Sequence, residues 1–129
     1  MYKRVFSAAF VTLLAGHAFA LDNSVIRQLE ELEPEEQLEQ RCDIEAMSRI
    51  RSEQSGFNPD KVIAYTFSPP DVDGNSIHAS GAVVRSRGKW YRLKYQCETG
   101  EKHLKVKKFD YEMGALIPRN EWQKYYLYD

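Results

Sequence analysis

Two cysteines, Cys42 and Cys97, constrain the possible folds of this 129-residue chain more than any other feature of its sequence. They lie about 55 positions apart, a spacing unlike the C-x-x-C of redox-active pairs. A lone pair in the cytosol would indicate a redox or metal-binding role, whereas in an oxidising compartment it most simply forms one structural disulfide. The compartment therefore decides how the pair is interpreted.

The first twenty residues predict export. Lys3 and Arg4 precede an apolar run, and residues 18–20 read Ala-Phe-Ala, a small-x-small cleavage pattern. The run of about twelve residues is too short to span a bilayer as a helix, although a retained anchor is the alternative. We therefore predict a signal peptide at residues 1–20 and a single mature domain at residues 21–129. That domain has no integral membrane segment and is periplasmic or secreted.

Residues 34–53 predict a long helix with Cys42 in its middle. At 100° per residue its apolar side chains fall within an arc of about 120°, a core-facing stripe of ordinary width. The stripe consists of Leu38, Cys42, Ala46 and Ile50. Pro34 suits the first turn, where a helix needs no N–H. Residues 22–31 predict a weaker helix, which is a possible cover for Ile44 on the far side of the long helix.

The charged residues of the long helix are expected on its flanks or at its surface. They are Arg41, Asp43, Glu45, Arg49 and Arg51. Residues 22–53 hold ten acids and four bases, whereas residues 54–129 hold nine acids and twelve bases. This pattern favours a solvated acidic helix beside a basic sheet over a functional acid cluster. It does not support nucleic-acid binding, which needs a strongly basic domain.

A β-hairpin around Arg87-Gly88 predicts the surface that faces the helix. If its loop has two residues, Val84 lies opposite Tyr91 and Ala82 lies opposite Leu93. The period of two then sorts the side chains into two faces. The apolar face carries Ala82, Val84, Tyr91, Leu93, Tyr95 and Cys97. The other face carries Val83, Arg85, Trp90, Arg92, Lys94 and Gln96. Two independent periodicities thus place both cysteines on facing surfaces, as a disulfide requires.

Four further segments complete the expected architecture. Residues 61–67 predict a strand whose inner face the pattern leaves open, and residues 68–76 predict a long, mobile polar loop. A last strand runs from Lys102 or His103 to Tyr111, with a β-bulge where the alternation slips at residues 107–108. Residues 117–126 predict a short helix that packs Trp122 on the domain. The predicted fold is α+β, with a long N-terminal helix disulfide-linked to an antiparallel sheet of about four strands, and a short C-terminal helix.

Several blocks of the sequence carry a resemblance. The longest is residues 38–47, Leu-Glu-Gln-Arg-Cys-Asp-Ile-Glu-Ala-Met, and the others are residues 32–35, 59–65, 86–93, 97–99, 103–106, 109–111 and 117–122. In the same order they resemble a family of small exported alphaproteobacterial proteins known only as a domain of unknown function (family 930). The resemblance covers essentially the whole mature domain. It implies a Gram-negative, envelope-directed protein and carries over no catalytic residues.

The sequence contains none of the common catalytic motifs, such as G-x-S-x-G, H-E-x-x-H or a P-loop. His78 is expected in the long loop and His103 at a strand start, so the two are isolated and indicate neither a metal site nor a Ser/His pair. Asp71 and Asp73 have the chemistry to bind a cation, but a capped polar turn is favoured. We therefore predict no catalytic residues, no metal and no cofactor.

One surface supports a functional hypothesis, the outer face of the sheet. It is expected to carry Arg85, Trp90, Arg92 and Lys94, with Lys105 on the adjoining strand. An aromatic ring flanked by cations stacks on sugars and pairs with carboxylates or phosphates. Alternatively, such cations only keep a one-sided sheet dissolved and discourage edge pairing.

The favoured function is a non-enzymatic envelope protein. It would bind an anionic envelope component, such as a glycan, or a protein partner through the basic outer face. The alternative is a periplasmic inhibitor or chaperone-like accessory protein that acts through the acidic helix or the long loop. An enzyme is the third and least favoured class.

Overall fold

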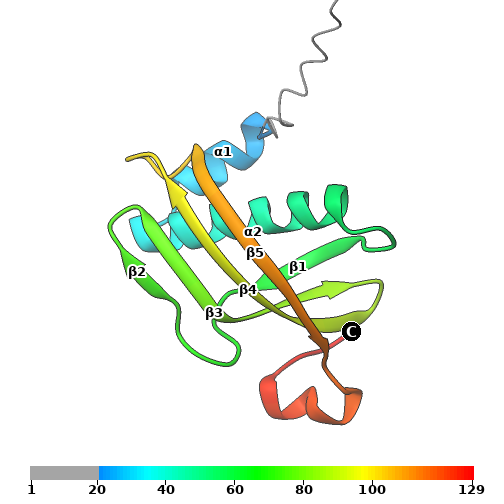
Figure 1. Ribbon diagram of the computed structural model, residues 1–129. Coiled ribbons are helices and arrows are strands. Elements are labelled where there is room, and N and C mark those ends of the chain that lie inside the picture. Colours follow the sequence, from blue (N-terminus) through cyan, green and yellow to red (C-terminus); the bar gives the residue numbers. More distant parts are fainter. Residues whose placement is uncertain (1–20) are drawn as a thin grey trace, which may run out of the picture.

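The computed structural model describes residues 21–129, so the predicted signal peptide at residues 1–20 lies outside the described part. Within that part, α2 lies across one face of a five-stranded antiparallel sheet and α1 packs on α2 (Figure 1). Among these residues, no helix combines the length and apolar character needed to cross a membrane. The α+β prediction is confirmed, and the expected count of about four strands was one too low.

Both helices occupy the predicted segments. α1 spans Asn23–Glu30 and α2 spans Pro34–Glu53. The Asp22 side chain caps α1 by accepting a hydrogen bond from the Ser24 amide at 3.1 Å. Pro34 begins α2. Proline suits this position because the N–H groups of a first turn have no acceptor within the helix, so its missing N–H costs no hydrogen bond. The acids that follow it lie at the positive end of the helix dipole.

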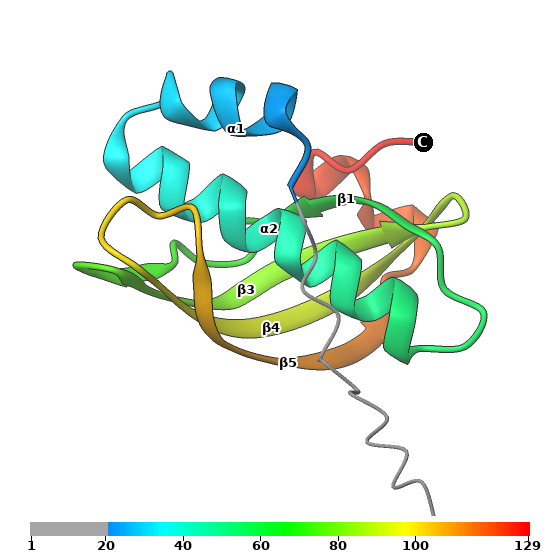
Figure 2. The ribbon, with the colours of Figure 1, turned by 90° about the horizontal axis from the view of Figure 1, so that it is seen from above.

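The strands are β1 (Pro59–Ile63), β2 (Asp71–Asp73), β3 (Ser76–Ser86), β4 (Lys89–Thr99) and β5 (Val106–Leu116). Their order in the sheet is β1-β3-β4-β5. β2 and β1 pair with opposite ends of the same edge of β3. Figure 2 shows the sheet edge-on, with β5 at one side and α2 crossing above it.

Strand β2 corrects the prediction of one long loop over residues 68–76. Asp71 and Asp73 are poor strand formers, so local propensity gave no signal for a strand. The pairing instead arises from a two-residue turn, in which Gly74 adopts φ 59° and Asp73 lies opposite Ser76. His78 consequently lies in β3 rather than in a loop.

The β3–β4 hairpin has the predicted register, with Val84 opposite Tyr91 and Ala82 opposite Leu93. Arg87 and Gly88 both adopt positive φ, at 51° and 76°, which a tight two-residue turn between twisted strands requires. β3 starts earlier than expected because a bulge between Ala79 and Ala82 lets the strand continue toward Ser76.

Strand β5 begins later than predicted and ends later, at Leu116. Residues before Val106 form a loop, and a side chain of α2 binds the main chain of this loop. The Arg41 Nε donates to the Leu104 carbonyl at 2.9 Å. The predicted bulge is confirmed, because Glu98 pairs with Lys108 while Thr99 pairs with Val106. A second irregularity lies near the end of the strand, opposite Tyr91 and Leu93.

The main core lies between α2 and the inner face of the sheet. It contains the whole predicted stripe of α2 and the predicted apolar face of the hairpin. The strand predicted over residues 61–67 instead spans Pro59–Ile63, because the chain turns away from β3 after Ile63. Val62 lies on the inner face of β1 and, together with Ala64 just beyond the end of the strand, belongs to this core. Cys42 and Cys97 form the predicted disulfide, with their Cα atoms 6.1 Å apart.

The C-terminal segment differs from the predicted short helix. It forms two 3₁₀ turns, η1 (Arg119–Glu121) and η2 (Gln123–Tyr125), and Tyr126 ends them in a left-handed conformation. Trp122 packs on the domain as predicted, but it does so on the outer face of the sheet. There a second core forms from Val83, Trp90, Ile117, Trp122 and Leu127.

The flanks of α2 are more buried than the sequence indicated. Arg41, Asp43 and Glu45 are only 4%, 3% and 6% exposed, so their expected surface position was wrong. The reason is that the loop before β5 and the curved sheet cover the sides of the helix as well as its apolar stripe. Ile44 is half-buried beside α1, as the proposed cover required.

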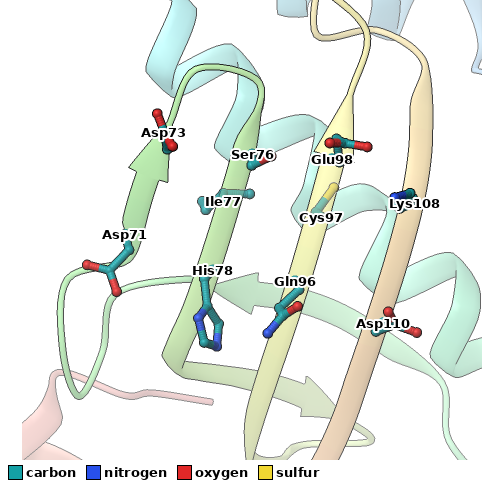
Figure 3. Close-up of a pocket in the computed structure, with 10 residues that line it drawn as sticks. All are labelled: Asp71, Asp73, Ser76, Ile77, His78, Gln96, Cys97, Glu98, Lys108 and Asp110. Atoms are coloured by element: carbon teal, nitrogen blue, oxygen red, sulfur yellow. The ribbon is translucent and has the colours of Figure 1, made fainter.

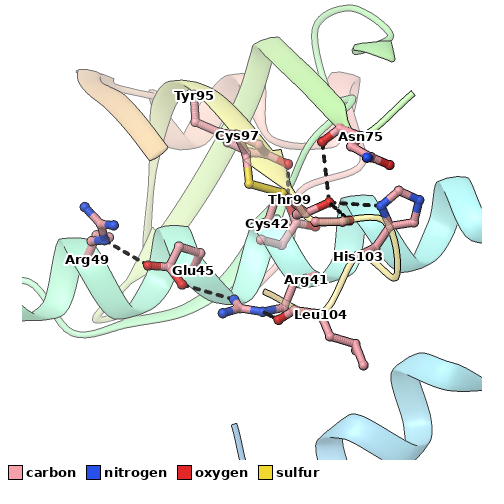
Figure 4. The surroundings of a disulfide bond; sticks show 12 residues. Arg41, Cys42, Glu45, Arg49, Asn75, Tyr95, Cys97, Thr99, His103 and Leu104 are labelled. Carbon is pink, nitrogen blue, oxygen red and sulfur yellow. Dashed lines mark hydrogen bonds and ion pairs between the residues drawn. A yellow bond between two sulfur atoms is a disulfide. The ribbon is translucent and has the colours of Figure 1, made fainter. Parts of the chain in front are cut away.

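Two of the buried flank charges, Arg41 and Glu45, lie beside the disulfide (Figure 4). Glu45 lies between two arginines, 3.1 Å from Arg41 Nη1 and 2.8 Å from Arg49 Nε. The first of these contacts is an ion pair without the alignment of a hydrogen bond. On the other side of the disulfide, Thr99 Oγ1 and His103 Nδ1 are 2.9 Å apart. The Thr99–His103 contact fastens the loop before β5 to the end of β4, while the hydrogen bond from Arg41 to Leu104 fastens that loop to α2.

Candidate binding site on the outer face of the sheet

Arg85 and Trp90 lie side by side, as predicted, but neither offers a free binding group. The Arg85 guanidinium donates to both carboxylate oxygens of Asp60, at 2.9 and 3.3 Å. These hydrogen bonds raise the pKa of Arg85 above its usual value, so the side chain is a charged but paired group. Its cation also lies over the rings of Trp90 and Tyr128.

Trp90 corrects the hypothesis of an exposed aromatic ring. It is 0% exposed, and its indole N–H donates to the Tyr128 carbonyl at 2.8 Å. The alternation along β4 placed Trp90 on the outer face correctly. It gave no sign that the C-terminal segment folds over that part of the face.

The other three predicted residues do not form a continuous cationic surface. The Arg92 guanidinium stacks 3.7 Å from the centre of the Phe67 ring. Lys94 lies opposite Glu112 on β5, which opposes its charge. Lys105 lies in the loop before β5, off the strand on which it was expected. The structure therefore brings Arg85 together with Trp90, and separates both from Lys94 and Lys105.

The half of the outer face beyond the C-terminal segment carries two rows of polar side chains (Figure 3). Each row crosses the strands in the order β2, β3, β4, β5, through direct cross-strand neighbours. One row is Asp71, His78, Gln96 and Asp110, and the other is Asp73, Ser76, Glu98 and Lys108. These eight residues, which we call the outer trough, line a shallow hollow of about 390 Å³.

A second hollow of about 270 Å³ lies next to the outer trough on the same face. Its walls include Ser80, Lys94 and Glu112, the polar residues that follow the first row along β3, β4 and β5. Phe67 and Arg92 close the end nearest the C-terminal segment. The two hollows thus form one polar strip that ends where the second core begins.

The chemistry of the outer trough is that of a hydrogen-bonding surface with an excess of acids. The outer trough contains four carboxylates and one lysine, together with one histidine and one side-chain amide. Carboxylates accept hydrogen bonds from hydroxyl and amine groups, while the amide and imidazole both donate and accept. Within residues 21–129, no three His, Cys, Asp or Glu side chains are arranged to hold a metal ion.

Sequence reasoning placed Lys94 and Gln96 on this face but missed most of the outer trough. Asp71, Asp73 and His78 were assigned to a loop, because β2 has no local strand signal. Asp110 had a usable signal, since Phe109 and Tyr111 were expected to share one face and the residue between them must point the other way.

Comparison with known proteins gives one match. A family model described as "Domain of Unknown Function (DUF930)" matches residues 29–127, from the last turn of α1 to the C-terminal turns. No curated protein and no solved structure matches the chain. The match covers the disulfide, the sheet and both hollows.

Proposed function

Because the chain belongs to the DUF930 family, a domain of unknown function, we propose its role from its geometry: it is an exported, non-enzymatic domain that binds a glycan of the cell envelope in the outer trough. The two cysteines support export, because a buried structural disulfide is typical of an oxidising compartment. The N-terminal sequence, with its basic, apolar and small-residue regions, supports it independently.

The observation that carries this proposal is the unequal cover of the outer face. The C-terminal segment covers one half, where Trp90 of β4 and Trp122 of the segment are both buried, whereas the other half is left open and lined by polar side chains. Within each row, successive side chains come from neighbouring strands, which lie about 4.8 Å apart, a distance close to the length of one sugar ring. Successive carboxylate, imidazole and amide groups are therefore suitably placed for the hydroxyls of a chain of sugars.

The charge of the outer trough changes the expected ligand. The basic-face hypothesis favoured an anionic component, but the carboxylates Asp71, Asp73, Glu98 and Asp110 would repel phosphate and carboxylate groups. A neutral or amine-bearing glycan fits this surface better than a phosphate-rich one. The expected class of function, binding of an envelope component, remains our proposal.

The alternative of an inhibitor or accessory protein has less structural support. The loop that was expected to provide its contacts is partly fixed by β2. The acids in the middle of α2, Asp43 and Glu45, are buried rather than presented to a partner.

Titration with soluble glycans tests the proposal. We expect the disulfide-bonded protein to bind amine-bearing or N-acetylated glucosamine oligomers, and Asp71→Ala and Gln96→Ala each to weaken that binding by roughly tenfold, since each removes a hydrogen bond to the ligand. Calorimetry or chemical-shift titration measures the affinities. Arg87→Ala, an exposed turn residue outside both hollows, is the control and should bind as the wild type does.

Two results would contradict this function. One is a wild-type protein that binds phosphate-rich lipopolysaccharide but none of the glucosamine oligomers. The other is binding that Asp71→Ala and Gln96→Ala leave unchanged, because it would place the ligand outside the outer trough.

A further inference from the structure

Strand β5 ends the sheet with a long unpaired edge. It spans eleven residues, and in the described part of the chain β4 is its only strand partner. The opposite edge of the sheet is divided between β1 and β2, of five and three residues. A long free edge presents main-chain donors and acceptors to any strand that can approach it.

The hairpin register identifies which main-chain groups of β5 are free. In a two-residue hairpin the residues that flank the turn form a hydrogen-bonded pair. Lys89 and every second residue after it therefore direct their main-chain N–H and C=O groups toward β3. Two hydrogen bonds agree with this: Thr99 N donates to the Asn75 carbonyl at 2.9 Å, and Ile117 N donates to the Trp90 carbonyl at 2.8 Å.

The even-numbered residues of β4 therefore direct their main-chain groups toward β5. The partners of Lys94, Gln96 and Glu98 on β5 are Glu112, Asp110 and Lys108. These three residues direct their main-chain groups inward to β4. Phe109, Tyr111 and Met113 direct theirs outward, to the free edge. Any added strand must form its hydrogen bonds with this second set.

The side chains that flank this edge are one cation followed by two carboxylates. Lys108, Asp110 and Glu112 are all exposed and all lie on the outer face. We propose that β5 pairs with β5 of a second copy of this chain, antiparallel and centred on Phe109. Lys108 of each copy then lies opposite Asp110 of the other, which gives two attractive pairs about one two-fold axis.

Charge selects this register from its neighbours. Centring the pair on Asp110 places that carboxylate against itself, and centring it on Lys108 does the same for the ammonium group. Centring it on Tyr111 opposes Asp110 to Glu112. Of the registers centred on Lys108, Phe109, Asp110 and Tyr111, only that centred on Phe109 opposes no like charges among the three. Its Lys108–Asp110 pairs are of the non-hydrogen-bonded type, in which side chains approach most closely.

The pairing extends the outer trough, because Lys108 and Asp110 are also its β5 members. Two five-stranded sheets become continuous, and the troughs of the two copies meet at the axis. The bulge at Lys107 keeps the shared ladder short. We therefore expect a dimer that dissociates on dilution and weakens with added salt. This inference does not depend on the proposed glycan.

Charge-reversal variants test the pairing. The disulfide-bonded wild type should show a concentration-dependent monomer–dimer equilibrium by sedimentation. Lys108→Asp and Asp110→Lys should each weaken the dimer roughly tenfold, because each replaces two attractive pairs by two repulsive ones. An equimolar mixture of these two variants should dimerise at least as well as the wild type, since every altered side chain then meets an opposite charge. Lys89→Asp, which makes the same charge change at the hairpin turn, should leave the dimer unchanged.

Three results would overturn the proposal. They are a wild type that stays monomeric at the concentrations used for NMR spectroscopy, single variants that dimerise as well as the wild type, and a mixture that fails to recover. Recovery of Lys108→Asp by Glu112→Lys instead of Asp110→Lys would overturn the register. Thermal unfolding of each variant is the control. A variant that unfolds at the same temperature as the wild type but does not dimerise has lost the pairing and kept the fold.

Discussion

Replacing both cysteines, Cys42→Ala with Cys97→Ala, is expected to lower the free energy of unfolding by about 4 kcal/mol. The disulfide closes a loop of 55 residues, and a cross-link of that span removes about this much chain entropy from the unfolded state. For a domain of this size the melting temperature should fall by roughly 15–20 °C. Circular dichroism during heating, beside urea titration, measures both quantities.

The single variant Cys42→Ala separates the cross-link from the packing of the sulfur atoms. It removes the cross-link while keeping Cys97, so it should lose nearly as much stability as the double variant. Wild-type protein treated with a reductant should lose the same amount. Native oxidised protein should contain no titratable thiol. A double variant within about 1 kcal/mol of the wild type would show that the cross-link contributes little.

The disulfide was also the part of the fold most accessible to sequence reasoning. The helical period placed Cys42 on one surface, and the strand period placed Cys97 on another. Each period follows from local backbone geometry, so neither depends on knowing the tertiary structure. The disulfide joins a residue of the apolar stripe of α2 to a residue of the apolar face of β4. These two surfaces must therefore pack against each other.

The candidate site was less predictable, because it depends on what covers each face. Alternation along β4 shows that Trp90 and Gln96 share the outer face, but it cannot show that Trp122 covers the first and nothing described covers the second. That difference arises from how the last residues of the chain return to the sheet. It is a tertiary property with no local signal in β4.

The same limit explains why α2 was read as an acidic surface helix. The apolar stripe of α2 shows only the smallest part of the helix surface that must be buried. Asp43 lies outside that stripe. It is buried because β4 supplies a partner, with the Tyr95 hydroxyl donating to its Oδ1 at 2.7 Å. A buried polar group needs such a partner, and the partner is visible only once the helix and the strand are packed together.

This pair gives the second large prediction. Burial raises the pKa of the Asp43 carboxyl well above its usual value, and nearby Glu39 adds to the rise, while the Tyr95 hydrogen bond and Lys61 oppose it. The folded protein therefore holds a proton that the unfolded chain releases at lower pH. Its stabilising contribution is present in acid and is lost as the pH rises through the folded-state pKa.

Asp43→Asn should remove this part of the pH dependence. The amide keeps an acceptor for the Tyr95 hydroxyl but does not ionise. As the pH rises above the ordinary pKa of an aspartate, about 4, the variant should therefore become more stable than the wild type and show a flatter profile, because only the wild type loses stability as its buried carboxyl ionises. Urea unfolding at a series of pH values measures it. Asp73→Asn, the same change at an exposed position on β2, should leave the wild-type slope in place.

Tyr95→Phe should act in the opposite direction. It leaves the Asp43 carboxyl buried without its donor, which costs about 2–3 kcal/mol where that carboxyl is ionised and less where it is protonated. Because the lost hydrogen bond had lowered the pKa of Asp43, the fall in stability should extend to higher pH than in the wild type. In the Asp43→Asn background the same substitution should cost less and show no such dependence. Equal costs of Tyr95→Phe at low and high pH would contradict a buried, titrating Asp43.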